Sequence, residues 1–302
     1  MLTISEEDVE RFLNVNELRD AMEQALMAFS SGQVTQPVRS VVRVGEHDGW
    51  FGLMPAVYGD LMGAKLVTVY PKNAGRGIHT HNAVIQLFRA ETGEPLATLG
   101  GRTITALRTA AVSALATREL ASEFATTLAI LGSGVQARAH YRALQQVREF
   151  AETRVWSRTS EHARQFAEEI DARVAASAEE AVRGADVIVT VTSSTEPILQ
   201  GAWLKEGAHV NAVGAVGLAA RELDEEAMIR SAVVVESREA AREESGEIRR
   251  AGVRIYAELG EIFAGAVAKP KCASTVYKSL GIAVEDIAAA KLVVEKRLLG
   301  GL

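Results

Sequence analysis

Residues 126–147, TTLAILGSGVQARAHYRALQQV, decide the fold. An apolar run at 128–131 leads through two glycines into a segment with one apolar helical face, which predicts a β-strand, a tight turn and an α-helix. The spacing Gly132-x-Gly134-x-x-Ala137 fits the dinucleotide fingerprint. Gly132 allows the sharp turn, Gly134 lets a pyrophosphate approach the backbone, and Ala137 lets helix and strand pack closely. The free N–H groups of the helix N-terminus would then bind phosphate.

The same spacing also occurs at ordinary strand-to-helix turns, so its context matters. Four more apolar runs follow, at 153–156, 186–192, 209–213 and 232–236, and helical stretches separate most of them. Such alternation predicts a Rossmann-type, doubly wound parallel sheet. In the first half, strand-like runs at 38–44, 50–54, 63–70 and 82–88 follow one another with only turns between them. The fold class is therefore α/β, with a second α+β domain that holds an antiparallel sheet.

The domain boundary is expected in an alanine-rich helix at about 106–120. We expect residues 1–117, completed by about 281–302, to form one domain, and residues 118–280 to form the NAD(P)-binding domain. An amphipathic helix is expected at 284–299. The charged run at 236–250 predicts an exposed helix with i,i+4 ion pairs.

Composition narrows the class of protein. The 302 residues are 48% hydrophobic and 24% charged, which is typical of a soluble globular protein. A net charge of −6 and the lack of a basic stripe argue against a nucleic-acid partner. Cys272 is the only cysteine, so we expect no intramolecular disulfide, no zinc cluster and no other metal site. With neither a signal peptide nor a membrane-spanning run, we expect a cytoplasmic protein without a membrane partner.

The end of the second strand of the nucleotide fold favours NADPH over NADH. An NAD site usually has an acidic residue there, whereas this chain has Ser157, Arg158 and Thr159. An arginine and two hydroxyls suit a 2′-phosphate, although NADH stays possible. In the alternative interpretation Arg158 is a solvated charge, and Ser157 or Thr159 caps the helix that begins near Glu161.

Three basic residues of the first domain are candidates for binding an anion. Arg39 lies in the strand expected at 38–44, and Lys65 shares an apolar strand face with Val67 and Val69. Arg108 lies in the first turns of the alanine-rich helix, where a cation opposes the helix dipole unless an anion lies beside it. Each of the three could instead be a solvated charge or part of a structural ion pair.

Nine motifs follow one another in the order found in a known family. They are QPVRSVV (36–42), TALRTAAVSALAT (105–117), ILGSGVQA (130–137), VWSRT (155–159), GADVIVTVT (184–192), GAHVNAVGA (207–215), EESGEI (243–248), AELGE (257–261) and KSLGIAVED (278–286). On these motifs the chain resembles the ornithine cyclodeaminase and mu-crystallin family over nearly its whole length. The resemblance implies that the first domain binds substrate, and that its antiparallel sheets join two chains in a homodimer.

The resemblance also implies roles for single residues. The carboxylate of a small imino or amino acid substrate would be bound by Arg39, Lys65 and Arg108. Glu244 falls at a ligand-contacting position and is counted with the catalytic residues. The cofactor-binding positions would be Thr80, His81, Arg108, Gly132, Gly134, Val135, Gln136, Ser157, Arg158, Thr159, Thr192, Val213 and Ser279.

One departure from the family bears on the reaction. Ornithine cyclodeaminases have a proton-transferring aspartate where this chain has the stretch Ala215, Val216 and Gly217. Because valine cannot transfer a proton, we expect NADPH-dependent reduction of cyclic α-imino acids, such as Δ1-piperideine-2-carboxylate or Δ1-pyrroline-2-carboxylate, to cyclic L-amino acids. Two alternatives stay open: an NAD-dependent alanine dehydrogenase or ornithine cyclodeaminase, and a protein that binds NADPH and a small ligand without turnover.

Overall fold

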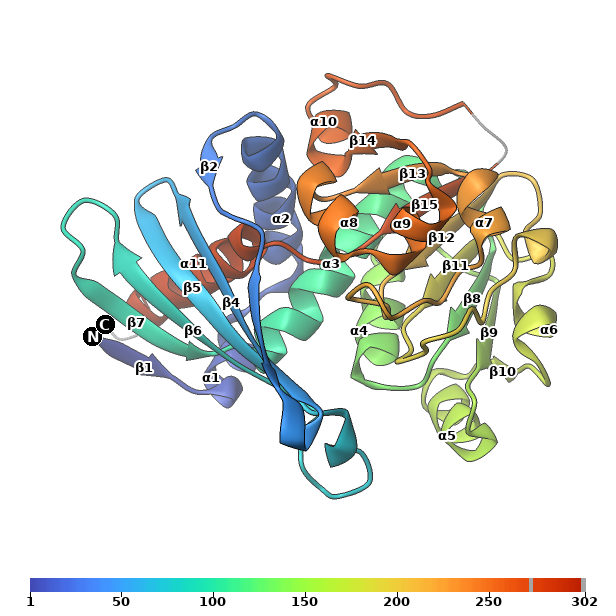
Figure 1. Ribbon diagram of the computed structural model, residues 1–302, viewed down its shortest axis with the longest axis horizontal. Helices are drawn as coiled ribbons and strands as arrows, with labels where there is room; N and C mark the ends of the chain where they lie inside the picture. Colours follow the sequence, from blue (N-terminus) through green and yellow to red (C-terminus); the bar gives the residue numbers. More distant parts are fainter. Residues whose placement is uncertain (272–273, 300–302) are drawn as a thin grey trace. The chain divides into compact units, whose positions relative to one another are not determined.

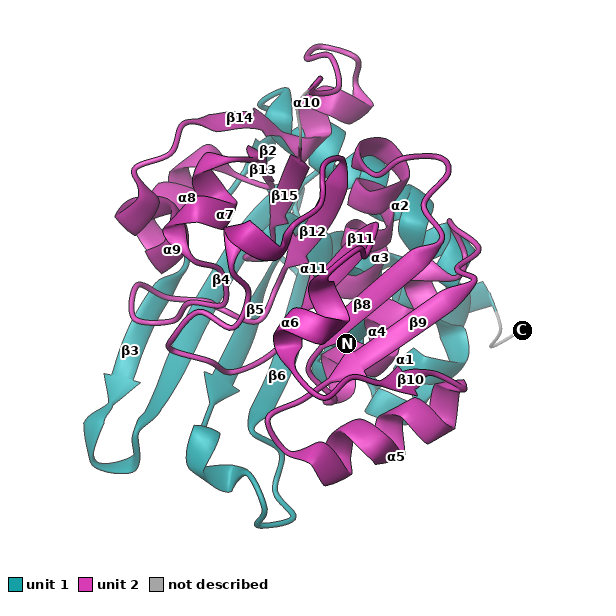
Figure 2. Cartoon of the chain, turned by 90° about the vertical axis from the view of Figure 1, so that its right-hand side faces the viewer, with its two compact units in different colours: residues 1–108, 281–302 teal, residues 109–280 magenta. Residues whose placement is uncertain are grey.

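The computed structural model describes residues 1–271 and 274–299, so Cys272 lies outside the described part of the chain. The chain forms two compact units (Figure 2). Unit 1 comprises Met1–Arg108 and Gly281–Leu302, and unit 2 comprises Thr109–Leu280. The first crossing between the units lies within helix α3 (Arg102–Leu120). Among the described residues, no helix has both the length and the apolar character needed to cross a bilayer.

Unit 1 is built on a seven-stranded sheet of order β1-β7-β6-β5-β4-β2, with β3 also paired to β4 (Figure 1). Its strands are β1 (Leu2–Ile4), β2 (Val34–Thr35), β3 (Ser40–Val44), β4 (Gly49–Tyr58), β5 (Leu61–Val69), β6 (His81–Arg89) and β7 (Pro95–Gly100). Strands β2 to β7 pair with their neighbours in antiparallel fashion, as predicted, whereas β1 lies parallel to β7. Neither β1 nor β7 was predicted, because each is short and β7 begins at a proline that reads as part of a turn.

Helices cover one face of the unit 1 sheet. They are α1 (Glu6–Phe12), α2 (Val15–Ser30), α11 (Ala283–Leu299) and the first part of α3. Two short 3₁₀ turns, η1 (Gly45–His47) and η2 (Pro71–Asn73), lie in loops. Helix α11 packs against α2, β4 and β5. Helix α3 starts four residues earlier than predicted because the Glu6 carboxylate accepts hydrogen bonds from the backbone N–H groups of Arg102 and Thr103, at 2.9 and 2.8 Å. A cap that lies so far away in sequence leaves no local start signal.

Unit 2 holds an eight-stranded sheet whose neighbouring strands are all parallel, in the order β10-β9-β8-β11-β12-β15-β13-β14. The strands are β8 (Thr127–Leu131), β9 (Glu152–Trp156), β10 (Arg173–Val174), β11 (Val187–Thr190), β12 (Ala208–Ala212), β13 (Ala232–Val235), β14 (Ile255–Glu258) and β15 (Ser274–Lys278). The sheet extends from β8 toward β9 on one side and toward β11 on the other. This reversal confirms the doubly wound prediction and marks the carboxyl ends of β8 and β11 as the expected ligand-binding edge.

Mostly short helices connect these strands: α4 (Val135–Leu144), α5 (Ser160–Ile170), α6 (Ala178–Val182), α7 (Glu225–Ile229), α8 (Arg238–Glu244), α9 (Gly246–Ala251), α10 (Leu259–Phe263) and the 3₁₀ turn η3 (Gly201–Trp203). The charged run at 236–250 is not one exposed helix. Ser245 ends α8, and its hydroxyl accepts a hydrogen bond from Ile248 N to start α9. Two carboxylates of the run, Glu236 and Glu247, are buried, so the prediction of a solvated helix is wrong there.

Candidate active site

The glycine turn of unit 2 has the shape that a pyrophosphate needs. Gly132 adopts φ +126°, and a Cβ there would lie 2.7 Å from the carbonyl oxygen of Val191, so only glycine fits. At Gly134, by contrast, a Cβ would meet no described atom within 4 Å. Packing therefore does not require this glycine, whereas a ligand close to the backbone would. Gly134 is the N-cap of α4 and offers no side-chain oxygen, which leaves the N–H groups of the first turn, at Val135 and Gln136, for phosphate.

The end of β9 presents the three residues predicted to hold the 2′-phosphate. Ser157 accepts a hydrogen bond from the Ser133 hydroxyl at 3.1 Å, which ties this end to the glycine turn. Arg158 and Thr159 are exposed, and no described residue forms an ion pair or hydrogen bond with the Arg158 side chain. Thr159 is the N-cap of α5, yet its hydroxyl caps no N–H of the described helix. The arrangement fits a group of negative charge at this position.

Three further predicted cofactor positions follow adjacent strands of the same sheet. Thr192 lies after β11, Val213 after β12 and Ser279 after β15. The Ser279 hydroxyl donates a hydrogen bond to the buried Glu236 carboxylate at 3.0 Å. Thr80 and His81, in contrast, belong to unit 1, where His81 begins β6. The roles of all five in cofactor binding stay predictions.

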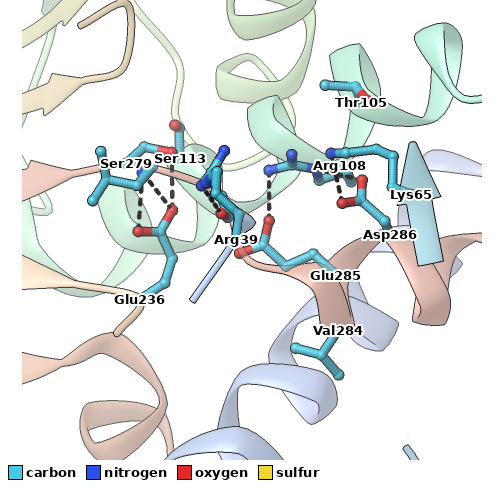
Figure 3. A network of polar contacts seen from close by, with 12 residues as sticks. Arg39, Lys65, Thr105, Arg108, Ser113, Glu236, Ser279, Val284, Glu285 and Asp286 are labelled. Carbon is cyan, nitrogen blue, oxygen red and sulfur yellow. Dashed lines mark hydrogen bonds and ion pairs between the residues drawn. The ribbon is translucent and has the colours of Figure 1, made fainter. Parts of the chain in front are cut away.

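The three candidate anion-binding cations gather in unit 1 around the start of α11 (Figure 3). Lys65 Nζ lies 2.6 Å from Oδ2 of Asp286, and Arg108 Nε lies 3.1 Å from Oδ1 of the same carboxylate. Arg108 Nη1 lies 2.6 Å from Oε2 of Glu285. Lys65, which was predicted to share an apolar face, is only 2% exposed. Asp286 thus bridges the lysine and one arginine.

Gly281 joins the second arginine to the cluster. Arg39 lies in the loop before β3, not in a strand as predicted, and its Nη2 donates to the Gly281 carbonyl at 2.6 Å. Gly281 adopts φ +70°, and a Cβ there would lie 2.8 Å from Cζ of Arg108 and closer still to its Nη1. The backbone of one residue therefore contacts both guanidinium groups.

An anion was expected near Arg108, and the chain supplies it. Because α3 begins at Arg102, Arg108 lies in its second turn, one turn later than predicted. Its partners, Glu285 and Asp286, occupy the first turn of α11, where the helix dipole favours negative charge. Neither acid was predicted to have a role, although an acidic pair at the start of an amphipathic helix is a visible signal.

Three cations and two carboxylates lie close together in this cluster. Lys65 and Arg108 pair with the carboxylates of Glu285 and Asp286, and Arg39 donates a hydrogen bond to the Gly281 carbonyl beside them. Burial lowers the pKa of Lys65 to about 8, although Asp286 opposes the shift. Burial alone would raise the pKa of Asp286, but Arg108 and Lys65 outweigh it and hold this pKa below its ordinary value. Three cations gathered in this way suit a ligand with a carboxylate.

Two predicted positions remain. Burial and the nearby cations Lys65 and Arg108 lower the pKa of His81 to about 4, so the ring is neutral at pH 7. Glu244 ends α8, and its backbone carbonyl accepts a hydrogen bond from Gly217 N at 3.0 Å. This bond ties Glu244 to the stretch that contains Val216, while a catalytic role for its side chain stays a prediction.

Comparison with known proteins assigns the chain to a family. A model of the ornithine cyclodeaminase/mu-crystallin family matches residues 1–301. The chain belongs to this family. Within it, the ketimine reductase mu-crystallin of Mus musculus is 48% identical, over 96% of this chain and 95% of that protein.

Two solved structures of the family have nearly the same fold. Thermococcus litoralis Δ1-pyrroline-2-carboxylate reductase, in complex with NADH and L-proline, gives a TM-score of 0.95 at 35% identity, over 100% of this chain and 99% of that one. An archaeal alanine dehydrogenase dimer with bound NAD gives 0.94 at 30% identity, over 100% and 97%. Because the family holds both imine reductases and an amino acid dehydrogenase, membership does not by itself fix the reaction.

Proposed function

We propose that this chain is an NADPH-dependent reductase of cyclic α-imino acids such as Δ1-piperideine-2-carboxylate or Δ1-pyrroline-2-carboxylate. The observation that carries the proposal is that Arg39, Lys65 and Arg108 gather around the start of α11, where three cations can bind one substrate carboxylate. The nucleotide-binding turn of unit 2 supports the cofactor, and the 48% identity to a ketimine reductase supports the reaction.

The proposed mechanism assigns binding and proton handling to unit 1. The three cations bind the substrate carboxylate by charge-assisted hydrogen bonds, which fixes the orientation of the imine. Reduced nicotinamide supplies the hydride when it is bound. The imine nitrogen must carry a proton to accept hydride readily. Lys65, whose pKa is about 8, is mostly protonated at pH 7 and can supply or hold that proton directly or through water.

Reduction of a preformed imine fits the stretch after β12 better than oxidation of an amino acid. Val216 is 38% exposed there and has no group that could take a proton from a substrate amine. This chain therefore lacks the acid on which a cyclodeaminase or an amino acid dehydrogenase would rely at this position. The proposal therefore favours the direction in which the substrate arrives already dehydrated and cyclic.

The first experiment follows the loss of the NADPH absorbance band with each of the two cyclic imines, and repeats it with NADH. Fast loss with NADPH and slow loss with NADH is the expected result, because Arg158 is free to pair with a 2′-phosphate. Turnover of L-alanine or L-ornithine with NAD+ and none of the imines would replace the proposal with amino acid oxidation. NADPH binding without turnover of any of these substrates would replace it with a binding function.

We also propose that the chain forms a homodimer through the uncovered face of the unit 1 sheet. Leu53, Leu66 and Val84 lie side by side across β4, β5 and β6 on this face, and the exposed Val42 and Val57 extend it. A contiguous apolar sheet face on a soluble chain is typical of an interface, and the archaeal alanine dehydrogenase relative is a dimer.

The dimer is tested by light scattering on Leu66→Glu, with Val174→Glu as the matched control. Both residues are 37% exposed, but Val174 lies on strand β10 of unit 2. We expect Leu66→Glu to be monomeric and the control to keep the mass of the wild type. A wild-type mass in Leu66→Glu would exclude this face as the interface.

A further inference from the structure

Glu222 is a buried carboxylate of unit 2 that the proposed reaction does not use. It follows β12 in sequence and accepts four hydrogen bonds. Oε1 accepts from the backbone N–H and the hydroxyl of Thr192, at 2.6 and 2.8 Å. Oε2 accepts from the hydroxyl of Thr190 at 2.8 Å and from the backbone N–H of Gly214 at 2.7 Å. One side chain thus ties the segment after β11 to the segment after β12.

A second buried carboxylate fixes Glu222 from behind. Glu247 Oε1 accepts hydrogen bonds from the backbone N–H groups of Glu222 and Leu223, at 2.8 and 3.1 Å. Its Oε2 lies 2.8 Å from Nζ of Lys278, which also donates to the carbonyl of Ala215 at 2.7 Å. The ends of β11, β12 and β15 are therefore linked by one chain of buried polar contacts.

The segments that follow β11 and β12 pack in direct contact at Thr192 and Gly214. A Cβ on Gly214 would collide with the backbone N and O of Thr192 and lie 2.6 Å from Oε1 of Glu222. Buried ion pairs are seldom retained for stability alone, because the loss of water offsets most of their attraction. The location suggests another reason, since ligands of open parallel sheets bind beyond the carboxyl ends of strands near the reversal of strand order. Thr192 and Val213, the predicted cofactor positions, lie in these two segments.

We propose that Glu222 is a positioning residue for the dinucleotide cofactor. The carboxylate holds the backbone at Thr192 and Gly214 in the conformation that binds the cofactor, and the Glu247–Lys278 pair holds Glu222. The inference rests on the proposed function, because it takes the dinucleotide as the ligand of this edge. Each oxygen accepts from one backbone N–H and one threonine hydroxyl, and because a backbone N–H can only donate, both oxygens must be acceptors, as they are in a carboxylate.

The test compares Glu222→Gln with Glu225→Gln. Glutamine has nearly the same shape, but its NH2 group would replace an acceptor and face a backbone N–H that can only donate. Glu225 lies three residues away on α7, is about half exposed and pairs with Arg221 on the surface. We expect Glu222→Gln to raise the Kd for NADPH, measured by fluorescence titration without substrate, at least about tenfold. The KM for NADPH should rise with it while the KM for the imine stays unchanged, and Glu225→Gln should resemble the wild type.

A second variant keeps the proposal testable if Glu222→Gln does not fold. Thr190→Val removes one donor to Oε2 within a buried strand and preserves the side-chain volume, and we expect about a threefold rise in the Kd for NADPH. The inference would be overturned if Glu222→Gln bound NADPH as tightly as the wild type. If Glu222→Gln does not fold, wild-type affinity in Thr190→Val would overturn it instead. Tight NADPH binding by the wild type without turnover of an imine would instead overturn the proposed reaction, so the two failures are distinguishable.

Discussion

Gly281→Ala should break the cation cluster of unit 1 through two separate effects. At φ +70° an alanine is strained by about 1–2 kcal/mol. Its Cβ would also lie 2.8 Å from Cζ of Arg108, whereas atoms in contact prefer about 3.5–4.0 Å, so the guanidinium must move by about 1 Å. Such a shift weakens its ion pairs with Glu285 and Asp286, and loss of a buried partner costs about 3–5 kcal/mol.

Gly252→Ala is the matched control for the strain. Gly252 adopts φ +61° at the end of α9, and a Cβ there would meet no described atom within 4 Å. The control should lose only the 1–2 kcal/mol of strain, with kcat/KM unchanged. Gly281→Ala should lose more of the free energy of unfolding in urea, and its kcat/KM for the imine should fall about 100-fold, since a displacement of 1 Å can reduce a rate by that factor. Equal losses of stability in the two variants, with wild-type kcat/KM in Gly281→Ala, would refute this account of the cluster.

The remaining predictions concern Lys65, Arg158 and two buried histidines. Lys65→Met should lower kcat/KM for the imine about 1,000-fold, and wild-type kinetics would remove Lys65 from the mechanism. In the wild type, kcat/KM should fall as pH rises above 8, because the ammonium of Lys65, with its pKa of about 8, is then lost; a flat profile to pH 9.5 would contradict proton donation by Lys65. Arg158→Ala should raise the KM for NADPH about tenfold and leave that for NADH unchanged, whereas equal effects on both would argue against a 2′-phosphate contact. Burial lowers the pKa of His140 and of His209 from 6.5 to about 4, so the unfolded chain binds protons that the folded chain rejects. Each histidine should therefore reduce the free energy of unfolding by up to roughly 3 kcal/mol as pH falls from 6.5 to 4. Unfolding in urea at several pH values measures this loss of stability, which should be smaller in His140→Gln.

The sequence predicted those features whose physical cause is local. The turn at Gly132 and Gly134 was predictable because strand, turn and helix signals lie within a few residues of each other. Strand alternation likewise placed Lys65 on the face of Val67, which is buried, although a solvated lysine stayed open until the fold showed its burial.

The missed features depend on partners that are distant in sequence. Arg108 and Asp286 are separated by 178 residues, so no local pattern shows that they form an ion pair. The Glu6 cap of α3 acts on a backbone N–H 96 residues away. Glu247 was expected to be solvated because charged runs usually are, and only the fold shows that its carboxylate binds the backbone of Glu222.

The order of synthesis gives the start of α11 an unusual importance. Lys65 and Arg108 leave the ribosome long before Glu285 and Asp286, whose carboxylates pair with them in the finished protein. Unit 1 consequently cannot reach its final charge balance during translation, however early its strands pair. A chain ending at residue 280 would contain every described strand of both sheets, yet it would lack the two carboxylates that pair with Lys65 and Arg108. A segment made after both sheets is therefore the one that completes the first unit.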